Sequence, residues 1–138
     1  MKVISARRGD CIENLLRESN VVSLHCPLTD QTRGLIGEWS LKEMKKNAIL
    51  INTARGPIVD EAALIKHLQK EPEFQAGLDV FEREPNVPRE LLELPNALCV
   101  PHIGSATVET RRKMAQICVE EAVRFAEGKP LQYECVYG

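Results

Sequence analysis

The sequence predicts an α/β fold: a partial doubly wound parallel sheet of about five strands with helices packed on it. Short apolar runs, typical of buried strands, alternate with segments whose apolar residues recur at helical spacing. Four of these runs are each followed by a polar loop. In a parallel sheet such loops gather at the carboxyl edge, where ligands bind. The sequence therefore predicts a functional cleft along one edge of one sheet.

The predicted strands are short and apolar, as strands buried on both faces of a sheet should be. Turn residues or amphipathic segments separate each one from the next. The five expected strands are Lys2–Ser5, Val21–Leu24, Ala48–Ile51, Ala76–Val80 and Ala97–Val100.

Capping signals predict three short helices between the strands. Asp10 is expected to begin a helix that ends near Glu18. Ser40, with Glu43 three residues later, has the spacing of a capping box. Asp60 is expected to cap a helix that runs through Lys70.

The longest predicted helix begins at Ala106 and ends at about Glu127. Gly128 can adopt the left-handed conformation that closes a helix, and Pro130 blocks its continuation. One broad side of this helix is expected to be apolar, with Val108, Met114, Ile117, Cys118 and Ala122.

Composition narrows the classes of function. The chain has 138 residues, which suits one domain, and its net charge of −2 gives no electrostatic reason to expect nucleic acid as a partner. No apolar run approaches the roughly 18 residues that a membrane span needs, so we expect no membrane partner and a cytoplasmic location. The five cysteines form no C-x-x-C pair, so reduced thiols are expected and no metal site.

His102 is the leading candidate for acid–base chemistry, because an imidazole titrates near neutral pH and this one follows a predicted strand. A carboxylate in the preceding loop could raise its pKa and orient the ring. Glu84 and Glu82 are equally plausible partners from the residues alone. Either could instead be an exposed carboxylate of a charged loop.

Arg55 and Asp79 also lie at predicted strand ends. The Arg55 guanidinium could bind a carboxylate through two parallel hydrogen bonds and polarise an adjacent carbonyl, or could be a surface arginine paired with Asp60. Burying Asp79 in an apolar strand requires hydrogen-bond donors, which a ligand amide or backbone N–H groups could supply.

Arg7 and Arg8 follow the first predicted strand. In a dinucleotide-binding sheet an acidic residue at such a strand end binds the ribose 2′-hydroxyl, whereas arginine accommodates a 2′-phosphate.

Four loops, taken together, resemble those of the D-isomer-specific 2-hydroxyacid dehydrogenases. They are His25–Thr29, Asn52–Gly56, Gly77–Pro85 and Pro101–Thr107, in that order and spacing. The resemblance extends from about Lys2 to Pro130. Within the family, the chain is most similar to the NADPH-preferring glyoxylate/hydroxypyruvate reductases.

The resemblance implies reduction of a small 2-oxo acid to a 2-hydroxy acid, with glyoxylate or hydroxypyruvate as substrate. It makes His102 the proton donor, Glu84 its partner and Arg55 the substrate clamp. It implies NADP(H) as the preferred cofactor, with NAD possible. Apolar surface left exposed where absent strands would pair predicts a homo-oligomer. The implied cofactor contacts are Arg7, Arg8, Cys26, Pro27, Thr53, Ala54, Arg55, Asp79, His102, Gly104 and Ser105.

The chain also departs from this Rossmann-like family. Members are more than twice as long, have a separate substrate domain, and carry a G-x-G-x-x-G loop after an earlier strand, and this sequence contains no such loop. We therefore expect a C-terminal fragment that lacks the first strand and the glycine-rich loop. Residues 1–127 would form a partial dinucleotide-binding domain ending in the long helix, and residues 128–138 a tail left from the substrate domain.

Two functions from different classes remain open at this point. One is a dehydrogenase half-site that keeps its acid–base residues but has little activity alone. The other is a non-catalytic α/β module for dimerisation or dinucleotide sensing.

Overall fold

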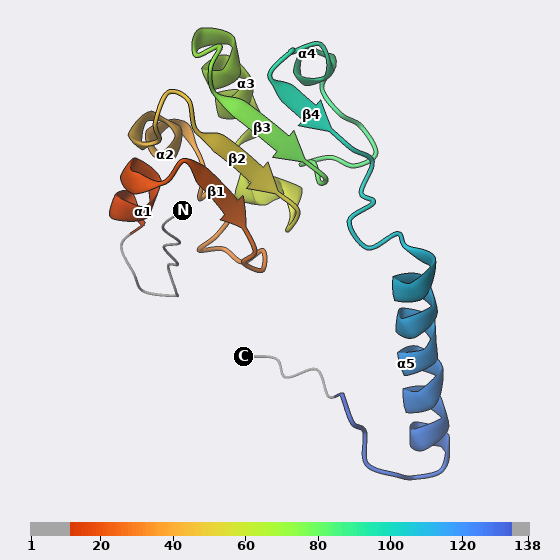
Figure 1. The fold of residues 1–138 in the computed structure, drawn as a ribbon. Coiled ribbons are helices and arrows are strands. Elements are labelled where there is room, and N and C mark those ends of the chain that lie inside the picture. The colour runs from red at the N-terminus through yellow and green to blue at the C-terminus, as the bar shows by residue number, and fades with distance from the viewer. Residues whose placement is uncertain (1–11, 134–138) are drawn as a thin grey trace. The chain divides into compact units, whose positions relative to one another are not determined.

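A computed structural model describes residues 12–133 (Figure 1). The chain divides into two compact units, one ending at His102 and the other beginning at Ile103. The expected strand Lys2–Ser5, the Asp10 cap and the Arg7–Arg8 pair lie outside the described residues.

The first unit contains a parallel four-stranded sheet whose spatial order follows the chain: β1 (Val21–Leu24), β2 (Ile49–Asn52), β3 (Gln75–Leu78) and β4 (Ala97–Cys99). Leu24, Asn52, Leu78 and Cys99 are register partners from strand to strand. All four strands therefore end together at one edge. The predicted α/β class with a parallel sheet is confirmed, and four of the five expected strands lie in it.

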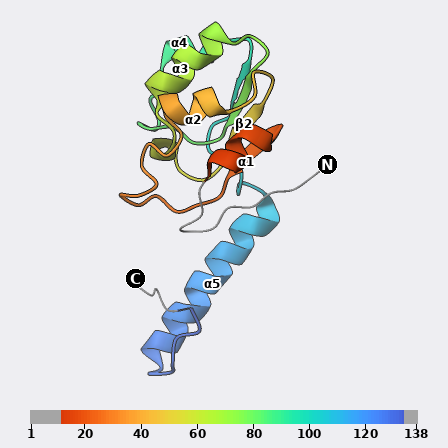
Figure 2. The same cartoon turned by 90° about the vertical axis from the view of Figure 1, so that its left-hand side faces the viewer.

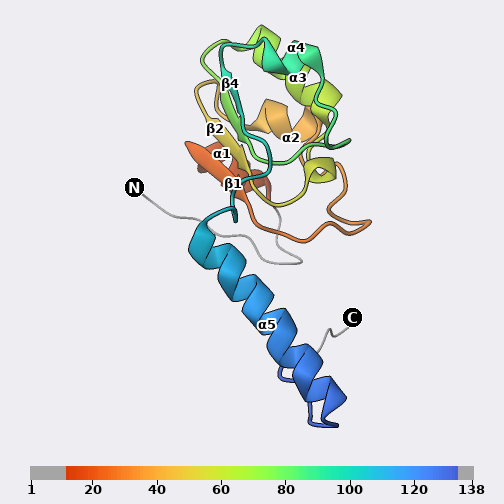
Figure 3. The ribbon, with the colours of Figure 1, turned by 90° about the vertical axis from the view of Figure 1, so that its right-hand side faces the viewer.

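One face of the sheet is covered. Helices α2 (Glu38–Glu43), α3 (Glu61–Lys70) and α4 (Arg89–Leu92) lie on the same side of the strands (Figures 2 and 3). Helix α1 (Glu13–Glu18) adds its buried Leu16 to the same apolar cluster. The strands contribute their alternate residues to this core, namely Val22, Leu24, Leu50, Ala76 and Leu78.

The opposite face is partly open. Val21 and Leu98 point to this face and are 48% and 68% exposed, and Ile49 and Ile51 between them are half-buried. Parallel sheets are normally covered on both faces. In this unit the described residues supply helices to only one of them.

The helix caps in the structure agree with the sequence prediction at α3 and differ from it at α2. Asp60 caps α3, because its carboxylate accepts a hydrogen bond from the Ala63 N–H at 2.9 Å. The Ser40 capping box is wrong: Gly37 is the N-cap of α2, and Ser40 lies inside the helix. Its hydroxyl donates instead to the Leu35 carbonyl at 2.6 Å. Helix α4, which follows Pro88, was not predicted.

The second unit consists mainly of α5 (Val108–Ala126). Thr107 caps it by accepting the Thr110 N–H, and Gly128 adopts the expected left-handed conformation with φ of 67°. No residue of α5 is fully buried, and of its predicted apolar side Ile117 is half-buried while the others are exposed. None of the described helices is long and apolar enough to cross a membrane. The domain boundary at residue 127 stays a prediction.

Candidate active site at the carboxyl edge of the sheet

The carboxyl edge of the sheet carries those predicted site residues of the first unit that the structure describes. Cys26 follows β1, Arg55 follows β2, Asp79 follows β3, and His102 follows β4. Adjacent strands lie about 4.8 Å apart, so the strands that lead to Arg55 and His102, with β3 between them, are about 10 Å apart. A small molecule can span that distance.

Glu84 and His102 form a hydrogen-bonded pair, with Oε2 of Glu84 2.7 Å from Nδ1 of His102. The hydrogen bond from His102 lowers the pKa of Glu84 below its ordinary value, and the Phe81 N–H, which donates to Oε1 at 3.0 Å, lowers it further. Glu84 is therefore an ionised acceptor at neutral pH, and Nδ1–H donates to it. This hydrogen bond fixes the imidazole ring and leaves Nε2 as the nitrogen for proton transfer. The His102 side chain is 52% exposed, so Nε2 can be reached from solvent.

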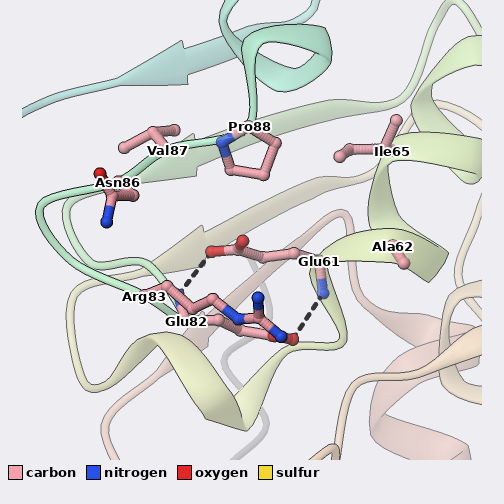
Figure 4. A pocket seen from close by; sticks show the side chains of 8 residues that line it. All are labelled: Glu61, Ala62, Ile65, Glu82, Arg83, Asn86, Val87 and Pro88. Atoms are coloured by element: carbon pink, nitrogen blue, oxygen red, sulfur yellow. Dashed lines mark hydrogen bonds between the residues drawn. The ribbon is translucent and has the colours of Figure 1, made fainter.

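The choice between Glu84 and Glu82 is settled by their different partners. Glu82 turns toward α3, where its Oε1 accepts the Glu61 N–H at 3.1 Å. Oε1 of Glu61 in turn accepts the Glu82 N–H at 2.6 Å (Figure 4). Glu84 alone of these carboxylates contacts the imidazole.

His102 has a backbone φ of 51°, which lies in the left-handed region. This conformation costs a non-glycine residue on the order of 1–3 kcal/mol, and such residues cluster at functional sites. The His102 N–H donates to the Val100 carbonyl at 3.0 Å, which closes a tight turn at the end of β4. The turn and the Glu84 carboxylate together set the direction of the ring.

Arg55 lies on an exposed loop that a buried asparagine holds in shape. Asn52, only 1% exposed, donates from Nδ2 to the Arg55 carbonyl at 3.0 Å and accepts the Ala54 N–H at 3.1 Å. The Arg55 guanidinium donates to the Ala54 carbonyl at 2.6 Å. Sequence reasoning missed the role of Asn52, although an amide that ends a buried apolar run was a usable signal.

A hollow of about 570 Å³ opens beside Arg55, between the loops that follow β1 and β2. Glu84 and His102 do not line it. Strand β3 lies between the strands that lead to Arg55 and His102, and the Arg55 guanidinium turns back on its own loop. The lining residues are His25, Cys26, Pro27, Leu28, Thr53, Ala54 and Arg55.

Three further predicted site residues are Asp79, Gly104 and Ser105. Asp79 is 5% exposed, and its negative charge partly opposes the lowering of the Glu84 pKa that the His102 hydrogen bond causes. Gly104 and Ser105 are exposed and belong to the second unit. Residues 12–133 contain no group of three His, Cys, Asp or Glu side chains that could hold a metal ion.

The chain matches the family model for "D-isomer specific 2-hydroxyacid dehydrogenase, NAD binding domain" over residues 3–104. The chain therefore belongs to the D-isomer-specific 2-hydroxyacid dehydrogenase family, within its NAD-binding domain.

Named relatives agree with this class. The glyoxylate reductase of Aeropyrum pernix is 54% identical over 119 residues, which are 86% of this chain and 36% of the relative. The glyoxylate/hydroxypyruvate reductase B of Enterobacter agglomerans is 50% identical over 126 residues, 91% of this chain and 39% of the relative. The chain thus spans between a third and two fifths of these two relatives.

Solved structures show the same fold. The TT0316 protein of Thermus thermophilus superposes with a TM-score of 0.85 at 46% identity, covering 91% of this chain and 40% of that one. The D-lactate dehydrogenase of Lactobacillus jensenii, solved with NAD+, gives a TM-score of 0.82 at 32% identity, covering 93% and 43%.

Proposed function

We propose that this chain supplies the catalytic edge of an NAD(P)-dependent 2-hydroxyacid dehydrogenase that reduces a small 2-oxo acid, such as glyoxylate or hydroxypyruvate. The observation that carries the proposal is the Glu84–His102 pair at the carboxyl edge of a parallel sheet, two strands from Arg55. Relatives named glyoxylate reductase and glyoxylate/hydroxypyruvate reductase support the substrate class.

His102 is the proton donor in this proposal. Reduction of a ketone or aldehyde places negative charge on the carbonyl oxygen, and a positioned imidazolium can protonate that oxygen as the charge develops. Glu84 holds Nδ1–H and stabilises the protonated ring, which directs Nε2 to the substrate. The partly exposed side chain can regain its proton from solvent.

Arg55 binds the substrate carboxylate. Its guanidinium presents paired N–H donors that match the two carboxylate oxygens. Within residues 12–133 the guanidinium donates to the neighbouring Ala54 carbonyl on the exposed loop, a contact that a substrate carboxylate can replace. The proposed catalytic set is therefore Arg55, Glu84 and His102.

The hollow beside Arg55 fits the reactive end of a nicotinamide cofactor. Pro27, Leu28 and Ala54 offer apolar surface for a ring, while Thr53 and the loop backbone offer polar groups for its amide. When bound, NAD(P)H supplies the hydride. The chain's own part is to hold the ring beside the substrate and to move the proton.

NADPH is the cofactor we propose as preferred, on the strength of Arg7 and Arg8 at the end of the predicted first strand. The test compares kcat/KM for NADPH and NADH in a chimera in which this chain's residues replace the matching segment of the Aeropyrum pernix glyoxylate reductase. Replacing both arginines by alanine should remove most of the preference. Equal kcat/KM values for the two cofactors in the unsubstituted protein would contradict the assignment.

A chimera tests the proposed reaction. The segment of the Aeropyrum pernix glyoxylate reductase that aligns with this chain would be replaced by this chain's residues, since the two are 54% identical over 119 residues. The chimera should reduce glyoxylate with NADPH, as followed by loss of nicotinamide absorbance. Arg55→Lys should raise the KM for glyoxylate, because one amine cannot form the paired contact.

The matched control is Arg89→Lys, since Arg89 lies on α4 and pairs with Glu93 away from the carboxyl edge. It should leave KM unchanged. A folded chimera that binds NADPH but reduces neither glyoxylate nor hydroxypyruvate would overturn the proposal and favour a dinucleotide-sensing module.

A further inference from the structure

Two glutamates outside the catalytic set join helix α3 to the loop that carries Glu84. Oε1 of Glu61 accepts the Glu82 N–H at 2.6 Å, and Oε1 of Glu82 accepts the Glu61 N–H at 3.1 Å. Figure 4 shows both bonds beside a pocket of about 360 Å³. Each residue is thus donor and acceptor to the other, which fixes both the distance and the orientation of the two segments.

Carboxylates accept two successive backbone N–H groups at the start of the loop segment Phe81–Glu84. Glu84 accepts the Phe81 N–H, and Glu61 accepts the next N–H along the chain, that of Glu82. Gly56, directly after Arg55, packs so closely on Phe81 that a Cβ would lie 1.9 Å from its carbonyl carbon. The Arg55 loop therefore contacts the Phe81–Glu84 segment at Gly56, and helix α3 is bonded to the same segment at Glu61.

We propose that Glu61 is a positioning residue whose carboxylate anchors the Phe81–Glu84 segment and so places Glu84 against the imidazole of His102. The role of this contact in catalysis rests on the proposed function. The placement of Glu84 against His102 can be measured in the chain without cofactor or substrate.

The charge environment of Glu61 supports a positioning role. Glu61 is only 8% exposed, and burial together with the charges of Glu82 and Glu84 raises its pKa. Burying a carboxylate near two others costs free energy, and hydrogen bonds to that carboxylate can offset part of the cost. The bond that it gains is the one to the Glu82 N–H, which opposes the rise in its pKa.

The experiment measures the pKa of the Glu84 carboxyl group by NMR titration in the full 138-residue chain. In the unsubstituted chain this pKa should lie below the ordinary value, because His102 and the Phe81 N–H donate to the carboxylate. Glu61→Ala should raise it toward the ordinary value, because the loop loses its anchor. Removing the Glu61 charge without moving the loop would have the opposite effect on Glu84 and lower its pKa.

Three further variants separate anchoring from charge and from helix stability. Glu61→Gln removes the charge but keeps an acceptor oxygen for the Glu82 N–H, so the pKa of Glu84 should stay as low as in the unsubstituted chain or fall below it. Glu61→Asp keeps the charge but is one methylene shorter, so it should behave like Glu61→Ala. Asp60→Ala removes the cap of α3 without touching the loop and should leave the pKa of Glu84 unchanged.

An unchanged pKa of Glu84 in both Glu61→Ala and Glu61→Asp would overturn the inference. So would a rise in Asp60→Ala as large as in Glu61→Ala, because helix stability would then explain both. If Glu61→Ala does not fold, Glu61→Asp and Glu61→Gln still decide the question. None of these outcomes depends on turnover, whereas the proposed function fails only if the chimera binds cofactor and does not reduce a 2-oxo acid.

Discussion

The two faces of the sheet differ sharply, although the same four strands form both. On the covered face, Leu50 is fully buried beneath the helices, whereas Leu98 on the opposite face is 68% exposed. The carboxyl edge is nevertheless formed, with Glu84 bonded to His102 and Asn52 holding the Arg55 loop. Among the described residues, helices on one face thus accompany a formed Glu84–His102 pair, while Val21 and Leu98 on the other face remain exposed.

The largest expected effect concerns turnover. The purified 138-residue chain should show no measurable reduction of glyoxylate by NADPH, because its sequence has no glycine-rich loop to hold the pyrophosphate. Lost positioning of the two reactants alone corresponds to roughly 7–11 kcal/mol of barrier. Turnover by the isolated chain equal to that of the chimera would show that one covered face suffices for catalysis as well as for geometry.

A matched pair of leucines tests the difference between the faces directly. Leu50→Ala should lower the free energy of unfolding by about 2–5 kcal/mol, because it leaves a cavity in the core. Leu98→Ala should change it by no more than about 0.5 kcal/mol, because the side chain is mostly in water. Urea denaturation followed by circular dichroism measures both. Equal losses would mean that the open face is covered in solution.

Self-association should follow from the open face. Among the described residues, Val21 and Leu98 lie on the two outer strands of the sheet, and outer strands can pair with another chain. Replacing both by lysine should shift the chain toward monomer in light scattering across a concentration series. Leu92→Lys is the control, because Leu92 is 56% exposed but lies on α4 of the covered side. If Leu92→Lys shifts the chain toward monomer by the same amount, then association does not depend on the open face of the sheet.

The smallest effect is a pH dependence from a histidine on the covered side. His67 on α3 packs edge-on against Phe74, with ring centroids 4.6 Å apart, and burial lowers its pKa. The unfolded chain then binds the proton more readily than the folded one, so stability falls as pH drops below about 6.5, until the folded pKa is passed. His67→Gln should reduce this slope in urea melts between those limits. An unchanged slope would exclude His67 as its source.

The sequence predicted most of the fold because the signals were local. Buried apolar runs identified the strands, and Asp60 and Gly128 marked helix ends where the structure has them. Ser40 misled because its hydroxyl found a carbonyl five residues back, whereas a capping box depends on the backbone turning at that residue. The short α4 had too few residues to show a helical period.

The site was predictable to the level of its loops but not of its contacts. Nothing in the residues distinguished Glu84 from Glu82, because their partners lie 18 and 21 positions away in the chain. The same holds for Glu61, which bonds Glu82 across the gap between a helix and a loop. Such pairs arise from packing α3 against the loop after β3, which no local pattern encodes.

The most direct test of the catalytic edge is whether Glu84 and His102 act as one unit. In the chimera, His102→Asn keeps a residue that tolerates the left-handed backbone and should lower kcat by about 10²–10⁴-fold. Glu84→Gln should lower kcat less, and the double variant should be no slower than His102→Asn alone, because the carboxylate acts only through the ring. Losses that multiply in the double variant, or a His102→Asn chimera that keeps its turnover, would contradict the account.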